Sequence, residues 1–111
     1  MPLSKRPIDR LRKSITQDNL WLYILKILKE EKTMHPYELN KKIEKKFSFR
    51  PGNVTAYLVL KRLEIDGYVR KSKSTKSLGP QRNNYMITEK GLKELKAAGP
   101  LLKKIMKNLW V

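Results

Sequence analysis

Basic side chains gather in one stretch of the second half of the chain. Between residues 69 and 83 the sequence has no acidic residue. The basic residues of this stretch are Arg70, Lys71, Lys73, Lys76 and Arg82. Guanidinium and ammonium groups neutralise phosphates, and so supply affinity for nucleic acid that depends on salt. We expect this stretch to lie along a phosphate backbone.

A second group of side chains, between Gly52 and Gly67, has the types needed to read bases. An amide can make two hydrogen bonds to adenine, aliphatic side chains can pack on thymine methyl groups, and hydroxyl groups can contact phosphates or bases. Tyr57 lies one position from the apolar stripe of its segment, which favours contact with a partner over burial in a core. The predicted contact residues are Asn53, Val54, Thr55, Tyr57, Leu58 and Lys61.

Residues that could catalyse a reaction or bind a metal are scarce. The sequence has no cysteine, and its single histidine, His35, cannot supply a metal site alone. His35 precedes Pro36, so we expect it to cap or pack at the start of a helix. Glu30, Glu31 and Glu44 lie among lysines, where ion pairs on helix surfaces account for them. We therefore expect neither an enzyme nor a bound cofactor.

The overall charge also points to a polyanionic partner. The 111 residues carry 26 Lys and Arg against 10 Asp and Glu, a net charge of +16 at pH 7. This length is typical of one domain. The longest apolar block, residues 20–28, is too short to cross a bilayer, and the N-terminus lacks the order of a signal peptide. We expect a cytoplasmic protein that is associated with the nucleoid and not with a membrane.

Local signals predict the elements that position these residues. Asp18 or Asn19 can cap a first helix, Pro36 suits the first position of a second, and Gly67 suits the end of a third. Past Gly67 the apolar period changes from that of a helix to that of a strand. Tyr37 and Tyr85 are expected to be packed. The predicted elements are helices over about 18–31, 36–47 and 53–66 and strands over 68–71 and 84–87.

Three helices followed by a basic hairpin are typical of a winged helix-turn-helix, a mainly α fold with a small antiparallel β-hairpin. In this fold the third helix enters the major groove, and the wing, here about residues 69–87, lies on the adjacent backbone. Thr88 is expected to cap a further helix that Gly99-Pro100 interrupts. The predicted divisions are a basic N-terminal arm or short helix (1–16), the winged-helix domain (17–98) and a C-terminal amphipathic helix (99–111).

The apolar segment over 20–28 predicts a homodimer. It is apolar on nearly all sides, so one face should lie in its own core and another against a second subunit. The C-terminal segment carries a single apolar stripe, as a helix at an interface would. The predicted dimerisation residues are Leu20, Trp21, Ile24, Leu102, Ile105, Met106, Leu109 and Trp110.

Over about residues 20–97 the chain resembles the PadR-like family of winged-helix transcriptional regulators. His35-Pro36-Tyr37-Glu38-Leu39 is similar to the family's entry into the second helix. Thr55-Ala56-Tyr57 with Leu60-Lys61-Arg62-Leu63-Glu64 and Gly67 is similar to its recognition helix. Asn84-Tyr85-Met86-Ile87-Thr88-Glu89-Lys90-Gly91 is similar to the strand that closes the wing and enters the next helix.

This resemblance implies a dimeric DNA-binding repressor that uses Thr55 and Tyr57 on its operator. It implies a dimer interface made by the first and the C-terminal helices. Val54 and Leu58 stand where family members usually have Gly and Pro, a departure that bears on the base contacts. The resemblance also permits a small hydrophobic or aromatic effector, for which Trp21 and Trp110 would line a pocket if they do not belong to a core or an interface.

The predicted function is therefore a homodimeric transcriptional regulator that binds double-stranded DNA by sequence, as a repressor at a palindromic operator. Two recognition helices about 34 Å apart would meet successive major grooves. One alternative is a chromatin-like or RNA-binding protein that uses the same scaffold without sequence preference. Another is a structural subunit of a larger nucleoprotein complex.

Overall fold

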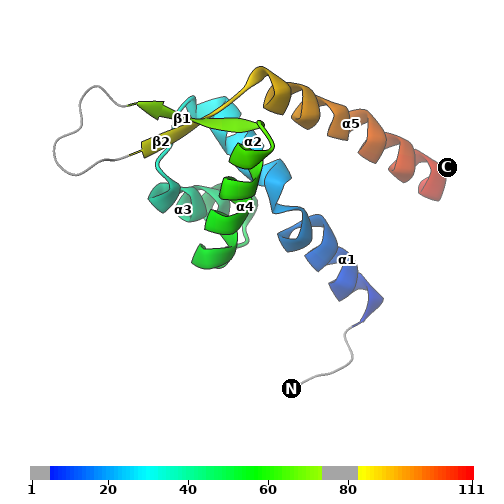
Figure 1. Cartoon of the computed structure of the whole chain (residues 1–111). Coiled ribbons are helices and arrows are strands. Elements are labelled where there is room, and N and C mark those ends of the chain that lie inside the picture. Colours follow the sequence, from blue (N-terminus) through cyan, green and yellow to red (C-terminus); the bar gives the residue numbers. More distant parts are fainter. Residues whose placement is uncertain (1–5, 74–82) are drawn as a thin grey trace.

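The computed structural model describes residues 6–73 and 83–111, which form a mainly helical chain with one hairpin (Figure 1). In chain order the elements are α1 (Pro7–Ile15), η1 (Gln17–Asn19), α2 (Leu20–Glu31), α3 (Pro36–Phe47), α4 (Asn53–Ile65), β1 (Val69–Lys73), β2 (Asn83–Ile87) and α5 (Glu89–Trp110). This is the predicted winged-helix order of three core helices and a two-stranded antiparallel wing.

The core forms where α2 is packed against α3, α4 and the wing. Ile24 and Leu25 of α2 are fully buried. Ile43 of α3, Leu60 of α4 and Val69 of β1 belong to the same apolar cluster. Burying large aliphatic side chains stabilises a fold by about 1.5–3 kcal/mol each, so this cluster fixes how α3 and α4 cross.

The wing is tied to the helical body by a third, very short strand segment. β1 and β2 are antiparallel, with Val69 opposite Ile87 and Lys71 opposite Tyr85. Met34, in the connection from α2 to α3, makes an isolated bridge with Tyr85. The Met34 N–H donates to the Tyr85 carbonyl at 3.0 Å, and the Tyr85 N–H donates to the Met34 carbonyl at 2.8 Å. These bonds hold the base of the wing next to the start of α3.

The end signals read from the sequence are confirmed for three elements. The His35 ring accepts a hydrogen bond at Nδ1 from the Tyr37 N–H at 3.0 Å, so this histidine caps α3. Thr88 Oγ1 accepts from the Gly91 N–H at 3.1 Å and caps α5. Gly67 has a φ of 87°, which glycine adopts without a side-chain clash, and it follows the end of α4.

The start of α2 differs from its prediction. Asn19 stands at the N-cap position, but its side chain makes no capping hydrogen bond to the helix. Its Nδ2 instead donates to the Ser14 carbonyl, and its Oδ1 accepts from Trp21 Nε1 at 3.3 Å. The amide therefore joins the end of α1 to Trp21, and a helical turn, η1, leads into α2.

The interruption predicted at Gly99-Pro100 is wrong, because α5 runs without a break from Glu89 to Trp110 with Pro100 inside it. Proline removes one backbone hydrogen bond, to the carbonyl four residues earlier, at Lys96. Lys96, Gly99 and Pro100 are all exposed, so water can satisfy that carbonyl and the ring meets no packed neighbour. The C-terminal helix is thus continuous with the helix that leaves the wing.

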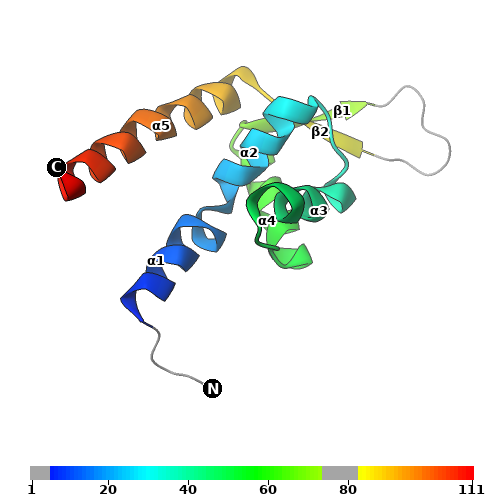
Figure 2. The same ribbon diagram turned by 180° about the vertical axis from the view of Figure 1, so that it is seen from behind.

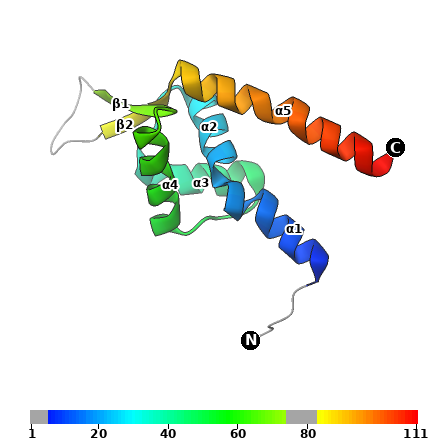
Figure 3. The same ribbon diagram turned by 45° about the vertical axis from the view of Figure 1, so that its right-hand side comes forward.

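Two helices protrude from the body on the side opposite the hairpin, as all three ribbon views show (Figures 1, 2 and 3). They are α1 and the C-terminal half of α5. α1 has no buried residue, and α5 buries only Gly91 and Ala98. Within the described ranges, no helix is both long enough and apolar enough to span a membrane.

Candidate nucleic-acid interface

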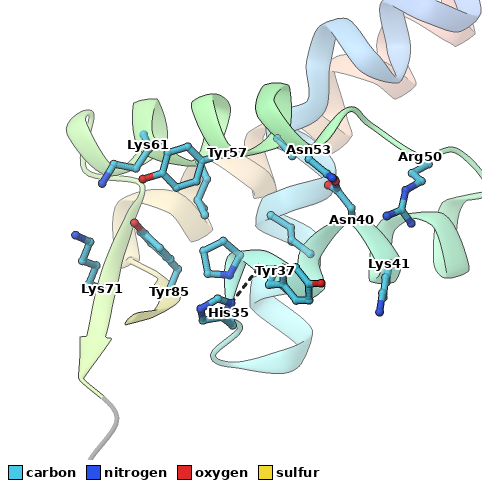
Figure 4. Close-up of a pocket in the computed structure, with 14 residues that line it drawn as sticks. His35, Tyr37, Asn40, Lys41, Arg50, Asn53, Tyr57, Lys61, Lys71 and Tyr85 are labelled. Atoms are coloured by element: carbon cyan, nitrogen blue, oxygen red, sulfur yellow. Dashed lines mark hydrogen bonds between the residues drawn. The ribbon is translucent and has the colours of Figure 1, made fainter. Parts of the chain in front are cut away.

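A hollow of about 480 Å³ opens between α3, α4 and the base of the wing (Figure 4). Its walls combine basic, amide and aromatic side chains. They come from His35, Pro36, Tyr37, Leu39, Asn40, Lys41, Arg50, Asn53, Ala56, Tyr57, Leu60, Lys61, Lys71 and Tyr85. Of the predicted contact residues, four lie here: Asn53, Tyr57, Lys61 and Lys71.

One end of the hollow is a cluster around Glu64. Lys61 Nζ lies 3.2 Å from Glu64 Oε1 and 5.9 Å from the centre of the Tyr57 ring. Tyr85, which is buried as expected, donates from its hydroxyl to the same Glu64 oxygen at 3.4 Å. The hydrogen bond to Glu64 raises the pKa of Lys61, and burial raises the pKa of Tyr85. Lys61 is therefore a cation held in place by Glu64, and the Tyr85 hydroxyl stays protonated and neutral.

The other end is formed by α3 and the turn before α4. Asn40 of α3 donates from Nδ2 to Oδ1 of Asn53, the first residue of α4 (Figure 4). Arg50 lies in the turn, 3.0 Å from Glu44, and remains partly exposed. Lys41 Nζ is 5.9 Å from the centre of the Tyr37 ring. Two cations thus border the site at which α4 begins.

The outer face of α4 carries the other predicted base-reading side chains. Val54, Thr55 and Leu58 are exposed and point away from the core stripe of Ala56 and Leu60. The residue before the helix is Gly52, so no side chain caps it. The N–H groups of the first helical turn have no partner within a helix, and they favour an anion such as phosphate.

The wing presents its basic residues on two faces. Lys71 is opposite Tyr85 in the register and borders the hollow. Arg70 alternates with it and is exposed on the other face of the hairpin. Lys73 ends β1, and only its backbone is described. Lys76 and Arg82 lie outside the described residues.

Three contributors to the hollow have polar side chains that sequence reasoning did not select: Asn40, Lys41 and Arg50. A fourth, Tyr37, was expected to be packed and that expectation is wrong, since it is 78% exposed. Position 37 directly follows the first residue of α3, where no earlier helical turn covers the ring. A helical wheel of α3 would have placed Tyr37, Asn40 and Lys41 on one face, but it would not have shown that α4 faces them.

The predicted dimerisation residues divide into two groups. Leu20 and Ile24 are 2% and 0% exposed within this single chain, so their assignment to a subunit interface is wrong. α2 is surrounded by its own α3, α4 and α5, which use most of its apolar surface. Trp21 is partly buried. The predicted dimerisation residues on α5 are all exposed, namely Leu102, Ile105, Met106, Leu109 and Trp110.

A second hollow, of about 340 Å³, lies beside Trp21 and includes Leu20, Leu63, Tyr68 and Glu94 in its lining. Trp110 is 75% exposed at the far end of α5 and does not line it. The two tryptophans therefore do not form one pocket in a single chain. Among the described residues, no group of three or more His, Cys, Asp or Glu side chains could hold a metal ion.

A helix-turn-helix with a wing, and a basic hollow at the start of its third helix, define the class of winged-helix DNA-binding proteins. The model of the transcriptional regulator PadR-like family matches residues 24–97. The chain belongs to this family, whose members regulate transcription and are not enzymes.

Solved structures agree with this assignment. A candidate transcriptional regulator from Thermoplasma acidophilum is 31% identical, with a TM-score of 0.67 over 80% of this chain and 84% of that one. A PadR-like transcriptional regulator from Bacillus cereus is 29% identical, with a TM-score of 0.66 over 88% and 95%. F93 from STIV, a winged-helix DNA-binding protein, is 25% identical, with a TM-score of 0.66 over 81% and 92%. No curated protein matches the sequence at a significant level.

Proposed function

We propose that this chain is a homodimeric, sequence-specific regulator of transcription that represses by binding a palindromic operator in the cytoplasmic nucleoid. The observation that carries the proposal is the basic hollow at the start of α4, bordered by Lys41, Arg50, Lys61 and Lys71. A net charge of +16 adds a general attraction for DNA. A bound repressor would act by occupying the DNA that the polymerase needs.

In this proposal α4 lies in the major groove and reads bases from its first turns. Val54 and Leu58, exposed on the outer face, pack on thymine methyl groups, and the Thr55 and Tyr57 hydroxyls donate to bases or phosphates. Asn53 and Lys61 flank them on the side of the hollow. Arg70 and Lys71 contact the backbone from the wing, together with Lys73, Lys76 and Arg82.

The dimer is proposed to form through the protruding helices. α5 exposes apolar side chains along its C-terminal half, and α1 exposes Ile8, Leu11 and Ile15 at helical spacing. Exposed apolar side chains that line one face of a helix are typical of a protein interface. Since both helices leave the body opposite the wing, pairing through them leaves both copies of α4 free for DNA (Figure 2).

A small hydrophobic or aromatic effector stays a prediction. The hollow beside Trp21 is the place to look for it, because a planar molecule there would contact the indole and the Tyr68 ring. Quenching of Trp21 fluorescence in a Trp110→Phe variant would report such binding without the signal of the exposed tryptophan.

The test is a selection of bound fragments from random duplex DNA, followed by titration of the best site against scrambled DNA at physiological salt. We expect an inverted-repeat consensus and a preference of about a thousandfold or more. Equal affinity for both duplexes would instead establish a chromatin-like or RNA-directed protein. A monomer that binds free DNA weakly would establish a structural subunit of a larger complex.

A further inference from the structure

Asn40 is the one buried polar side chain of the described core, only 5% exposed. It lies on α3 where that helix meets the start of α4 (Figure 4). Its Nδ2 donates to Oδ1 of Asn53, and its own Oδ1 has no hydrogen-bond partner among the described residues. A buried carbonyl without a partner costs about 1–3 kcal/mol, so this arrangement calls for a reason beyond packing.

The direction of this hydrogen bond follows from which group is left without a partner. With Asn40 as donor, one buried carbonyl oxygen is unpartnered. If both amides were reversed, the buried Asn40 group without a partner would be an NH₂ with two donors. Unpartnered N–H groups are rarer in protein interiors than unpartnered carbonyls. The orientation observed is therefore the less costly one, and burial of Asn40 holds it.

The consequence appears at Asn53, which is exposed at the first position of the recognition helix. Its Oδ1 accepts from Asn40, which uses one of the two lone pairs of that oxygen and holds it toward α3, so the Nδ2 donor is the part of the amide left toward a ligand. The two-bond contact between asparagine and adenine needs a free acceptor for the adenine N6 amino group and a donor for N7. While Asn40 holds Oδ1 toward α3, the adenine amino group would have to reach the remaining lone pair of an oxygen directed at the protein, so the two-bond contact is disfavoured.

We propose that Asn40 is a positioning residue that sets base preference through Asn53, which then selects a base edge offering acceptors alone, guanine or thymine, over adenine. The inference rests on the proposed function, since it names what one residue of the DNA-reading helix prefers. Guanine presents N7 and O6 and thymine presents O4 in the major groove, and none of these atoms donates.

A measurement on the free protein tests the hydrogen bond independently of DNA. In NMR spectra of the wild type, we expect the Asn40 side-chain amide protons to exchange slowly with solvent and to show a cross-peak to the Asn53 side chain. The Asn53 side-chain resonances should shift in Asn40→Leu. Fast exchange at Asn40, or unchanged Asn53 resonances in the variant, would overturn the proposal.

Binding selections then test base preference with four proteins: wild type, Asn40→Leu, Asn53→Ala and the double variant. The base position read by Asn53 is the one whose preference is lost in Asn53→Ala. At that position the wild type should prefer guanine or thymine, and Asn40→Leu should raise relative affinity for adenine roughly tenfold, about the value of one two-bond base contact. In the Asn53→Ala background, Asn40→Leu should change nothing, which a merely structural role would not predict.

The melting temperature serves as the control for correct folding. It should be unchanged or higher in Asn40→Leu, because a buried carbonyl without a partner is removed. Asn40→Ala removes the same amide without adding atoms, and it must give the same change in base preference. A wild-type preference for adenine at that position, or an unchanged preference in both Asn40 variants, would refute the inference while leaving the proposed function standing. A wild type without any sequence preference would overturn both, and the NMR result would still report the hydrogen bond.

Discussion

At Gly91, α5 lies tightly against the backbone just before β1 and against β2, and replacement of this glycine by alanine gives a sharp test of the fold. A Cβ at residue 91 would lie 2.2 Å from the Tyr68 carbonyl oxygen and 2.7 Å from Cγ1 of Ile87. The first of these neighbours is backbone at the start of the wing. The Gly91 N–H also donates to Thr88 Oγ1 and so takes part in the cap of α5.

The expected loss of stability follows from these contacts. Non-bonded heavy atoms prefer a separation of about 3.5 Å, so α5 or the Tyr68 backbone must move by about 1 Å. Overpacking of this kind costs about 1–3 kcal/mol, and a weakened N-terminal cap costs about 1 kcal/mol more. Alanine regains about 0.5–1 kcal/mol of helix propensity over glycine. The free energy of unfolding of Gly91→Ala should therefore fall by about 1–3.5 kcal/mol.

Thermal unfolding followed by circular dichroism measures this change. For a domain of this size, the expected loss lowers the melting temperature by roughly 5–20 °C. Gly99→Ala is the matched control, because a Cβ at residue 99 would meet nothing within 4 Å. That variant should melt a few degrees above the wild type, since it gains helix propensity without a clash. If Gly91→Ala melted at or above the wild-type temperature, the close approach of α5 to Tyr68 would be refuted.

Three further predictions concern the charged and apolar surfaces. Lys71→Ala should weaken binding to all DNA duplexes alike and reduce the slope of log affinity against log salt by about 1. The control variant Lys107→Ala, far along α5, should change neither quantity. A loss of affinity confined to one DNA sequence would contradict a contact with the phosphate backbone. The hydrogen bond from Lys46 lowers the pKa of Glu30, so this link between α2 and α3 should stabilise the fold at neutral pH and lose its effect as the pH falls below the ordinary carboxyl pKa of 4.5. In denaturant titrations, the stabilities of the wild type and Glu30→Gln should therefore converge in acid. A difference in stability that stays constant with pH would contradict the assignment. Ile105→Glu should raise the dissociation constant of the dimer roughly tenfold or more, because it buries a charge in the proposed interface. If the variant still sediments as a dimer at low micromolar concentration, the interface lies elsewhere.

Element types and most element ends could be predicted from the sequence because their signals are local. His35 caps α3 and Pro36 is its first residue, so both signals lie where the helix begins, and Gly67 has the positive φ that its place after α4 requires. The alternation along 84–87 needs only the residues themselves. The prediction at Pro100 failed because the effect of a proline depends on its surroundings in the fold and not on the local sequence alone. Proline ends a helix only when the lost hydrogen bond and the ring cannot be accommodated, and an exposed site accommodates both.

The candidate site was predicted on one side only. The residues of α4 could be selected because a recognition helix exposes its outer face whatever lies behind it. The opposite wall of the hollow belongs to α3, and its residues meet α4 only through the crossing of the two helices. Asn40 and Asn53 are joined in the structure, although no periodicity in the chain relates them.

The sequence by itself determined the order of helices and strands, the basic character of the wing and the residues that α4 presents, since these depend on composition, period and neighbouring residues. Tertiary structure decided that Leu20 and Ile24 face the chain's own core, that α5 runs unbroken through Pro100 with its apolar stripe exposed, and that Asn40 meets Asn53. The physical reason is that a period of 3.6 residues marks a face of a helix but not the neighbour that covers it. That neighbour is chosen by the packing of the whole core, which no single segment encodes.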